Sequence, residues 1–126
     1  MRPVPAQSRS CRHPGIITIG SCFADRVPAA VLGVYAPSKS ALAGFTKALA
    51  RELGPKEVTV NLVHPGSIDT DMNPTHGPVA DTLRQFKALG RFGKADDIAS
   101  AVAFLASAKA QYITGSTLTV DDGANA

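Results

Sequence analysis

The pattern of hydrophobic and polar positions predicts three short strands separated by helices. Apolar and β-branched runs at residues 16–20, 58–63 and 117–120 end in glycine, proline or acidic residues, which is typical of buried strands. Apolar residues three and four positions apart predict a long helix over 35–53 and a second helix over 96–107. Strands that alternate with helices in this order are typical of a parallel sheet with right-handed crossovers. We therefore expect an α/β fold with helices on both faces of the sheet.

The long helix has clear signals at both ends and two distinct faces. Pro37 is tolerated only in the first turn of a helix, so the helix should begin near Ala36. Gly54, which is followed by proline, predicts a left-handed glycine cap at its end. Small side chains on one face would let a second helix approach closely, as at a subunit interface. The apolar stripe consists of Leu42, Phe45, Leu49 and Leu53, and the small-residue stripe consists of Ser40, Gly44 and Ala48.

The stretch between the second strand and the last helix is rich in turn residues. Glycines and prolines recur over residues 67–90, and a short helix is predicted around 80–89. Asp96 and Asp97 then open the last helix, because acidic side chains in a first turn interact favourably with the helix dipole.

Composition indicates one globular domain behind a distinct N-terminal segment. The 126 residues are near the common size of a single domain. Residues 1–14 are rich in Arg, Ser and Pro and lack a hydrophobic period, so we expect a disordered leader there, or alternatively a short transit peptide. The arginines of this segment account for the net charge of +3. The remaining domain, residues 15–126, is neutral and has no basic stripe with interleaved aromatics, which argues against nucleic-acid binding.

The cysteines indicate a reducing compartment. Cys11 and Cys22 are too few and too unpatterned for a disulfide framework or a zinc site, so we expect reduced thiols and a cytoplasmic protein. Cys22 is interpreted as a small core residue. No apolar run approaches the roughly 20 residues that a membrane-spanning helix needs.

Other titratable residues give weaker signals. His64 and His76 have no partner at a useful spacing, and we interpret both as structural or surface residues. Asp69 and Asp71 flank Thr70 but have no evident third ligand, so we expect loop capping and no metal site.

One pair of residues carries a specific chemical signal. Tyr35 and Lys39 lie four positions apart, which places them on one face of a helix, one turn apart. The start of a helix is electropositive and the ammonium adds to that field, so the phenol should exchange a proton with an alcohol near neutral pH. Ser21 follows the first strand and Pro65-Gly66 follows the second, and ligands of parallel sheets bind beyond these strand ends. We expect these residues to face one crevice; the plain alternatives are an interface tyrosine, a solvated lysine and ordinary turns.

Five blocks of the sequence resemble the C-terminal half of short-chain dehydrogenases/reductases, and most closely the bacterial 3-oxoacyl-[acyl-carrier-protein] reductases. The resemblance covers roughly residues 15–126 and implies the C-terminal part of a doubly wound, Rossmann-type parallel sheet. The blocks are IITIGS, YAPSKSALAGFTKALARELGP, VTVNLVHPGSIDTDM, GRFGKADDIASAVAFLAS and YITGSTLTVDDGANA.

The resemblance implies an NAD(P)-dependent oxidoreductase that interconverts an alcohol and a ketone. It implies that Tyr35 is the proton donor and acceptor, that Lys39 assists it, and that Ser21 orients the substrate carbonyl. It also implies a mobile lid over residues 71–90, with Met72 as a possible substrate contact. The cofactor-binding residues that it implies are Tyr35, Lys39, Pro65, Gly66, Ile68 and Thr70.

The sequence also departs from the family pattern. The glycine-rich phosphate turn, the ribose-selecting residue and the catalytic asparagine of the preceding helix have no counterpart, and the first glycine is Gly15. We therefore expect the N-terminal half of the family domain to be missing, which leaves the choice between NAD and NADP open. Substrates ranging from a 3-oxoacyl thioester to a sugar or a steroid-like alcohol stay open as well. Smaller departures are Asp122 in place of the usual glycine and Ala95 in place of a proline.

Two functions follow from these observations. The first is an oxidoreductase that acts as a homo-oligomer through helix 35–53, or with a partner that supplies the missing half. The second is a truncated, non-catalytic remnant that at most pairs with intact subunits. We expect the isolated chain to be inactive and, because its first strand would lack a neighbour, prone to aggregation.

Overall fold

A three-stranded parallel sheet forms the centre of the protein. The computed structural model describes residues 13–28 and 30–126. The strands β1 (Gly15–Ile19), β2 (Thr59–Pro65) and β3 (Thr117–Val120) lie in the order β1-β2-β3, and both pairings are parallel. The predicted α/β class and the parallel sheet are both confirmed.

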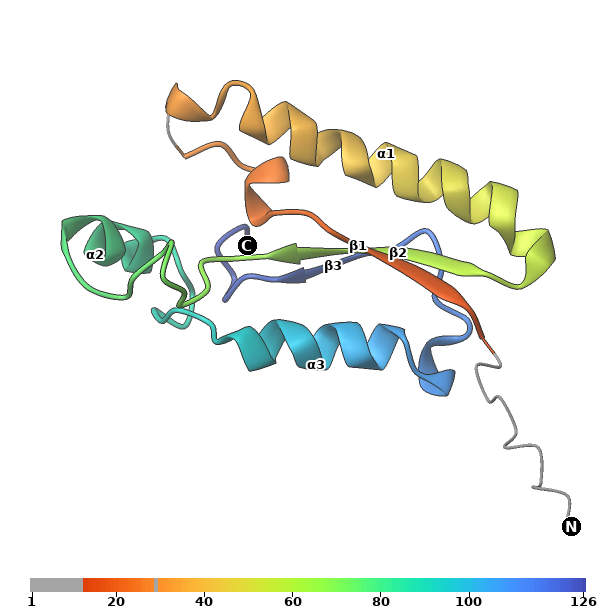
Figure 1. Cartoon of the computed structure of the whole chain (residues 1–126). Coiled ribbons are helices and arrows are strands. Elements are labelled where there is room, and N and C mark those ends of the chain that lie inside the picture. Colours follow the sequence, from red (N-terminus) through yellow and green to blue (C-terminus); the bar gives the residue numbers. More distant parts are fainter. Residues whose placement is uncertain (1–12, 29) are drawn as a thin grey trace, which may run out of the picture.

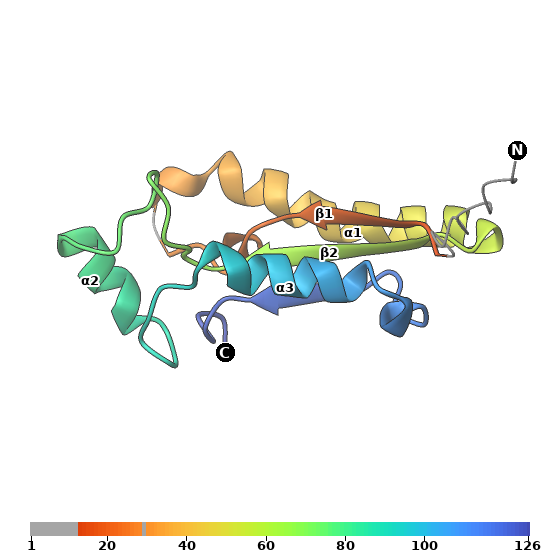
Figure 2. The same ribbon diagram turned by 60° about the horizontal axis from the view of Figure 1, so that its bottom comes forward.

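Two long helices cover opposite faces of the sheet, as predicted. Helix α1 (Tyr35–Leu53) lies along one face and helix α3 (Ala95–Leu105) along the other (Figure 1). Helix α2 (Pro78–Gln85) lies beyond the carboxyl ends of the strands, where both views show it projecting from the layers (Figure 2). Four short 3₁₀ helices occur in the described residues: Cys22–Ala24, Ala30–Leu32, Gly54–Lys56 and Ala108–Ala110.

The central strand supplies the core because both of its faces are covered. Val60, Leu62 and Val63 are fully buried, which is what a β-branched run between two helical layers should achieve. Val63 packs with Leu105 of α3 and with Ala110 in the main hydrophobic cluster, and partly buried side chains from β1, β3 and α3 surround them. The main hydrophobic cluster therefore lies between the sheet and α3.

Helix α1 packs on the sheet with a face that the sequence pattern identified only in part. Its buried residues are Ala36, Thr46 and Ala50. Phe45 of the predicted apolar stripe is 55% exposed. The other three members of the stripe, Leu42, Leu49 and Leu53, are partly buried beside that face. The predicted stripe therefore coincides only in part with the side of α1 that faces the sheet.

The predicted glycine cap of α1 is wrong. Gly54 has right-handed helical angles (φ −52°, ψ −44°), and the chain continues through the 3₁₀ turn Gly54–Lys56. The left-handed residue is Glu57 (φ 57°), whose N–H bonds to the carbonyl of Gly54. Pro55 fits the first positions of that extra turn, so the helix is extended before the chain reverses.

Strand β1 forms one edge of the sheet in the described part of the chain. It pairs only with β2, and Ile16 and Ile19 remain 40% and 46% exposed. This agrees with the expectation of an uncovered first strand. The predicted leader lies outside the described residues up to position 12. Among the helices of the described residues, none combines the length and the apolar character that a membrane crossing requires.

Candidate functional site

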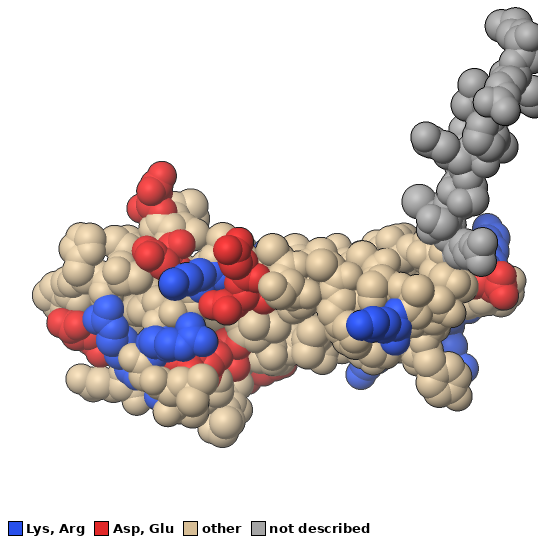
Figure 3. Space-filling view, turned by 90° about the horizontal axis from the view of Figure 1, so that it is seen from below, with Lys and Arg blue, Asp and Glu red and all other residues tan. Residues whose placement is uncertain are grey.

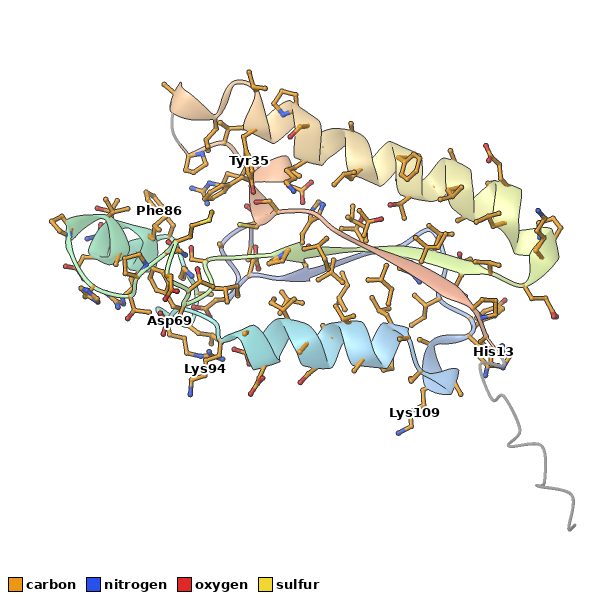
Figure 4. All side chains as sticks on the ribbon, viewed as in Figure 1. His13, Tyr35, Asp69, Phe86, Lys94 and Lys109 are labelled. Carbon is orange, nitrogen blue, oxygen red and sulfur yellow. The ribbon has the colours of Figure 1, made fainter. Side chains whose placement is uncertain are left out.

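A cleft of about 340 Å³ opens beyond the carboxyl ends of β1 and β2. Its walls come from three segments: the loop after β1, the start of α1, and the region from the end of β2 to α2. Figure 4 shows Tyr35, Asp69 and Phe86 at this end of the molecule, whereas His13 and Lys109 lie at the opposite end. The lining residues are Ser21, Cys22, Phe23, Leu32, Tyr35, Gly66, Ser67, Met72, Asn73 and Leu83.

The structure brings some of the predicted site residues together and leaves others aside. Ser21, Tyr35 and Gly66 line the cleft, and Met72 lines it from the predicted lid. Ile68 lines a neighbouring cavity of about 200 Å³ on the α3 side. The remaining predicted residues, Lys39, Pro65 and Thr70, are not among the residues that line either space.

Ser21 is buried at the floor of the cleft. Its hydroxyl oxygen accepts a hydrogen bond from the backbone N–H of Phe23 (3.2 Å), which caps the short helix Cys22–Ala24. A serine hydroxyl has one proton to donate in addition to its acceptor lone pairs. Capping therefore fixes the orientation of the side chain and leaves its proton for a ligand.

Tyr35 is the first residue of α1, and its side chain is 43% exposed. The ammonium of Lys39, one turn later, lies 5.6 Å from the centre of the Tyr35 ring. Lys39 forms no ion pair with the residues that the structure describes. Tyr35 thus lines the cleft with a cation beside its ring.

The segment after β2 is shaped by close backbone packing. Gly66 donates its N–H to the carbonyl of Val120 (2.9 Å), and a Cβ at Gly66 would lie 2.6 Å from the Cα of Asp121. Only glycine fits there without displacing the backbone. Beyond it, Ile68 bridges to Gly93, and Thr70 pairs with Asn73, which also donates a side-chain hydrogen bond to the Ile68 carbonyl (3.1 Å). The loop that follows Pro65 is therefore folded into short pairings.

A histidine that was interpreted as unpartnered has a partner. His64 is 1% exposed, and its Nδ1 lies 3.3 Å from Oδ2 of Asp25 in the loop after β1. Its Nε2 is buried without a hydrogen bond. A Cβ at Gly20 would lie 2.4 Å from the imidazole ring, so glycine makes room for it. The sequence could not show this pairing because the two residues are 39 positions apart.

Two buried titratable side chains lie beside the cleft. Burial, aided by the negative charge of Asp121, raises the pKa of the Cys22 thiol to about 11. The thiol therefore stays protonated and is a core residue, not a nucleophile. Burial lowers the pKa of Lys87, whose Nζ donates to the carbonyls of Arg91 (3.2 Å) and Ser67 (3.4 Å).

Charged side chains are mixed around this end of the molecule. On the face seen from α3, acidic and basic groups alternate near α2, and this face carries no continuous basic stripe (Figure 3). Within residues 13–28 and 30–126, no cluster of three or more histidine, cysteine or acidic residues could hold a metal ion. The polar side chains that line the cleft include the hydroxyl of Ser21, the phenol of Tyr35 and the amide of Asn73, and the ammonium of Lys39 lies beside the Tyr35 ring.

Sequence reasoning missed several lining residues. Phe23, Leu32 and Leu83 supply apolar walls, and Asn73 supplies an amide. Their types carry no special signal in the sequence. The position of Asn73, directly after Met72 in the predicted lid, was the one available hint.

Comparison with known proteins gives a consistent result. A family model described as enoyl-(acyl carrier protein) reductase matches residues 5–125. The cyclic-di-GMP-binding biofilm dispersal mediator protein of Escherichia coli K12 is 46% identical over 106 residues, which are 84% of this chain and 45% of that protein. The 3-oxoacyl-[acyl-carrier-protein] reductase FabG of the same organism is 48% identical over 114 residues, 89% of this chain and 46% of FabG.

A solved structure agrees with these relatives. The short chain dehydrogenase from Burkholderia cenocepacia, crystallised in complex with NADP, is 54% identical and superposes with a TM-score of 0.86. The match covers 89% of this chain and 46% of that one. The chain therefore spans about half the length of the curated relatives and of this structure.

Proposed function

This chain belongs to the short-chain dehydrogenase/reductase family, and we propose that it serves as an NAD(P)-dependent oxidoreductase that interconverts an alcohol and a ketone. The family consists of oxidoreductases that use a nicotinamide cofactor. One observation carries the proposal for this chain: Ser21, Tyr35 and Gly66, from three separate segments, line a single cleft, and Lys39 stands over the Tyr35 ring.

Each polar group at the cleft has a distinct role in this proposal. Tyr35 passes its phenolic proton to the carbonyl oxygen during reduction and takes a proton from the alcohol during oxidation. Lys39 stabilises the phenolate that forms when the proton leaves, because a cation favours the charged form of its neighbour. Ser21 donates its free hydroxyl proton to the carbonyl oxygen, which orients and polarises the substrate.

The start of α1 and the end of β2 suit the nicotinamide end of a cofactor. Lys39 has no ion-pair partner among the described residues, and Tyr35 carries a phenolic proton, so both side chains could donate hydrogen bonds to the hydroxyls of a ribose. When bound, the cofactor supplies the hydride that the carbonyl carbon receives. NADPH is the first candidate, since a relative was crystallised with NADP, and NADH stays open as the alternative. The residues that would hold the cofactor are Tyr35, Lys39, Pro65, Gly66, Ile68 and Thr70.

The substrate, partners and location follow from weaker observations. A 3-oxoacyl thioester is the first candidate substrate because FabG, a 3-oxoacyl-[acyl-carrier-protein] reductase, is a relative. We place the protein in the cytoplasm, in keeping with the free, buried thiol of Cys22. We further propose that α1 pairs either with a second copy of the chain or with a polypeptide that completes the cofactor site. Either partner would cover the exposed Phe45.

The test is the oxidation of NADPH with a 3-oxoacyl thioester by the purified chain and its Tyr35→Phe variant, and the parent's rate also decides whether the isolated chain is inactive, as its sequence leads us to expect. Removal of the phenolic proton should lower kcat by about a thousandfold, within the usual range for a general acid. Tyr112→Phe is the matched control, because Tyr112 is fully exposed and does not line the cleft. Equal losses in both variants, or an unchanged rate in Tyr35→Phe, would argue against the proposal.

A second candidate is a non-catalytic chain that pairs with intact family members. The exposed face of α1 favours it, together with the fact that the chain spans about half the length of its relatives. Fluorescence titration with NADPH and NADH separates the two candidates. A dissociation constant below about 100 μM, or about 5.5 kcal/mol of binding free energy, without a partner would contradict the non-catalytic role.

A further inference from the structure

The last residues of the chain contact two walls of the cleft, the loop after β1 and the end of β2, and also the loop that follows α2. Directly after β3, residues 121–125 turn back across the carboxyl ends of the strands (Figure 1). Their hydrogen bonds reach the loop after β1 and the loop that follows α2, and Asp121 packs on Gly66 at the end of β2. The contacted loops are far apart in the sequence, and residues 121–125 connect them in space.

Asp122 binds the loop after α2 with its backbone and its side chain. Its carbonyl accepts the N–H of Ala88 (2.8 Å). Its two carboxylate oxygens accept the N–H groups of Leu89 (3.0 Å) and Arg91 (2.9 Å), on either side of the left-handed Gly90. Charge-assisted hydrogen bonds of this kind are stronger than neutral ones. Asp122 therefore holds the whole turn that ends the predicted lid.

The backbone of Asp122 is strained in this conformation. Its φ of 61° lies in the left-handed region, where an aspartate is disfavoured relative to glycine. The family resemblance places glycine at this position. A glycine could not make the side-chain contacts to the 88–91 turn, and these contacts offset the strain.

Asn125 and Ala124 bind the loop that carries Ser21. The side-chain amide of Asn125 donates to the carbonyl of Cys22 (2.7 Å), directly after Ser21, and Arg26 donates to the carbonyl of Ala124 (3.1 Å). The buried carboxylate of Asp121 accepts the N–H groups of Gly123 (3.0 Å) and Asn125 (3.2 Å), which fixes the turn itself.

We propose that residues 121–125 form a strap that fixes the loop after β1, the end of β2 and the loop after α2 relative to one another, with Asp122 and Asn125 as its positioning residues. As regards catalysis the proposal rests on the proposed function, because neither residue touches the reacting atoms. Asn125 acts through the backbone next to Ser21, and Asp122 acts through the loop that follows Leu83 and α2. The strap determines how closely the lid approaches the serine.

Hydrogen–deuterium exchange on the purified chain tests the strap without requiring activity. In Asp122→Gly, glycine suits the φ of 61°, so the variant removes the carboxylate contacts and keeps the backbone. We expect exchange over residues 86–92 to rise about tenfold, the loss expected for a charged hydrogen bond, while β2 stays unchanged. Asp122→Asn retains one acceptor and should give a smaller rise. Asp96→Asn, an exposed acid on α3, is the charge control and should give none.

The second arm tests the link to the serine loop. Asn125→Asp has the same shape but no proton to donate to the Cys22 carbonyl, so exchange over residues 22–26 should rise about tenfold. In the reductase assay this variant should raise the KM for a 3-oxoacyl thioester about fivefold, with kcat and NADPH affinity within twofold, as expected when positioning alone is lost.

The exchange and activity results distinguish the strap from general destabilisation and from a failure of the proposed function. Exchange within twofold of the parent in both loops would overturn the strap, and so would an equal rise in β2, which would indicate general destabilisation. If Asp122→Gly does not fold, Asp122→Asn and Asn125→Asp give the answer. A parent chain that neither binds NADPH nor reduces the thioester would show that the isolated chain is not catalytic, and the exchange data would still confirm or refute the strap.

Discussion

At the scale of single residues, the environment of a side chain decides its chemistry more than its type does. Cys22 follows Ser21 directly, yet one is a buried protonated thiol and the other a capped hydroxyl at the floor of a cleft. His64 had been interpreted as structural, and it lies in the core with its Nδ1 facing Asp25. The role of that histidine is therefore to join the end of β2 to the loop that carries Ser21.

His64→Ala should lower the free energy of unfolding by about 2–4 kcal/mol, because removal of a large buried side chain leaves a cavity between β2 and α1. His76→Ala is the matched control, since His76 is exposed and should change stability little. Urea unfolding of both variants measures the difference. Equal midpoints for the two variants would show that the buried imidazole of His64 does not stabilise the fold.

Cys22 should make stability depend on pH in the alkaline range. Its pKa is raised from 9.0 to about 11, so between these values the folded chain keeps a proton that the unfolded chain releases. Stability is then full below pH 9 and falls as pH rises toward 11, by about 2 kcal/mol. The pKa of Lys87 is lowered from 10.5, so just below pH 10.5 the unfolded chain holds a proton that the folded chain has released. In that range Lys87 makes stability rise with pH, opposite to the effect of Cys22.

The comparison of the parent with Cys22→Ala isolates the thiol. The alanine variant should be less stable at neutral pH, where a cavity replaces the sulfur, but should lose less stability between pH 9 and 11. Chemical unfolding at several pH values under reducing conditions measures both slopes. Parallel curves would mean that the thiol does not titrate differently in the two states.

At the scale of elements, local pattern predicted the positions of strands and helices well, and packing corrected their details. The strand predicted over 117–120 and the helix predicted over 35–53 have the bounds that the structure shows. The short helix predicted around 80–89 instead covers 78–85, since the turn that Asp122 holds begins soon after it. The end of α1 differs most, because the left-handed position falls on Glu57 and not on Gly54.

Glu57→Gly should therefore stabilise the chain. Glycine adopts a φ of 57° without the steric cost of a side chain, and relief of this strain is worth about 0.5–1 kcal/mol. Glu57→Ala removes the same charge and keeps the strain, so it should not show the gain. Thermal or urea unfolding distinguishes the two; a less stable glycine variant would contradict the assignment of strain.

At the scale of the whole molecule, the three layers leave specific surfaces open. The edge strand β1 exposes Ile16 and Ile19, and α1 exposes Phe45 beside its stripe of small residues. These surfaces are where a second copy or another polypeptide would bind, and they are also where the isolated chain would aggregate.

Gly44→Arg tests the role of the α1 surface in self-association. A Cβ at Gly44 meets no atom within 4 Å, so the substitution is tolerated inside the chain and should affect only contacts with a partner. If α1 pairs two copies of the chain, as proposed, light scattering should show an oligomer for the parent and a monomer for Gly44→Arg. The melting temperature of the variant should not fall, because glycine is a poor helix residue. Gly54→Arg is the control at the equally open end of the helix. An unchanged oligomer in Gly44→Arg would place the interface elsewhere.

The α/β class, the order of the elements, the family and the candidate site residues could all be predicted from the sequence. These follow from periodicity and from short blocks, which depend on neighbours within a few positions. The tertiary structure alone decided which face of α1 is buried, that Asp25 approaches His64, and that Asp122 and Asn125 reach the loops of the cleft. The last three contacts join residues 39, 33 and 103 positions apart. These contacts depend on the crossovers and the strand register, which bring the loops at the carboxyl ends of the strands together at one edge of the sheet. A local sequence pattern carries no information about such long-range contacts.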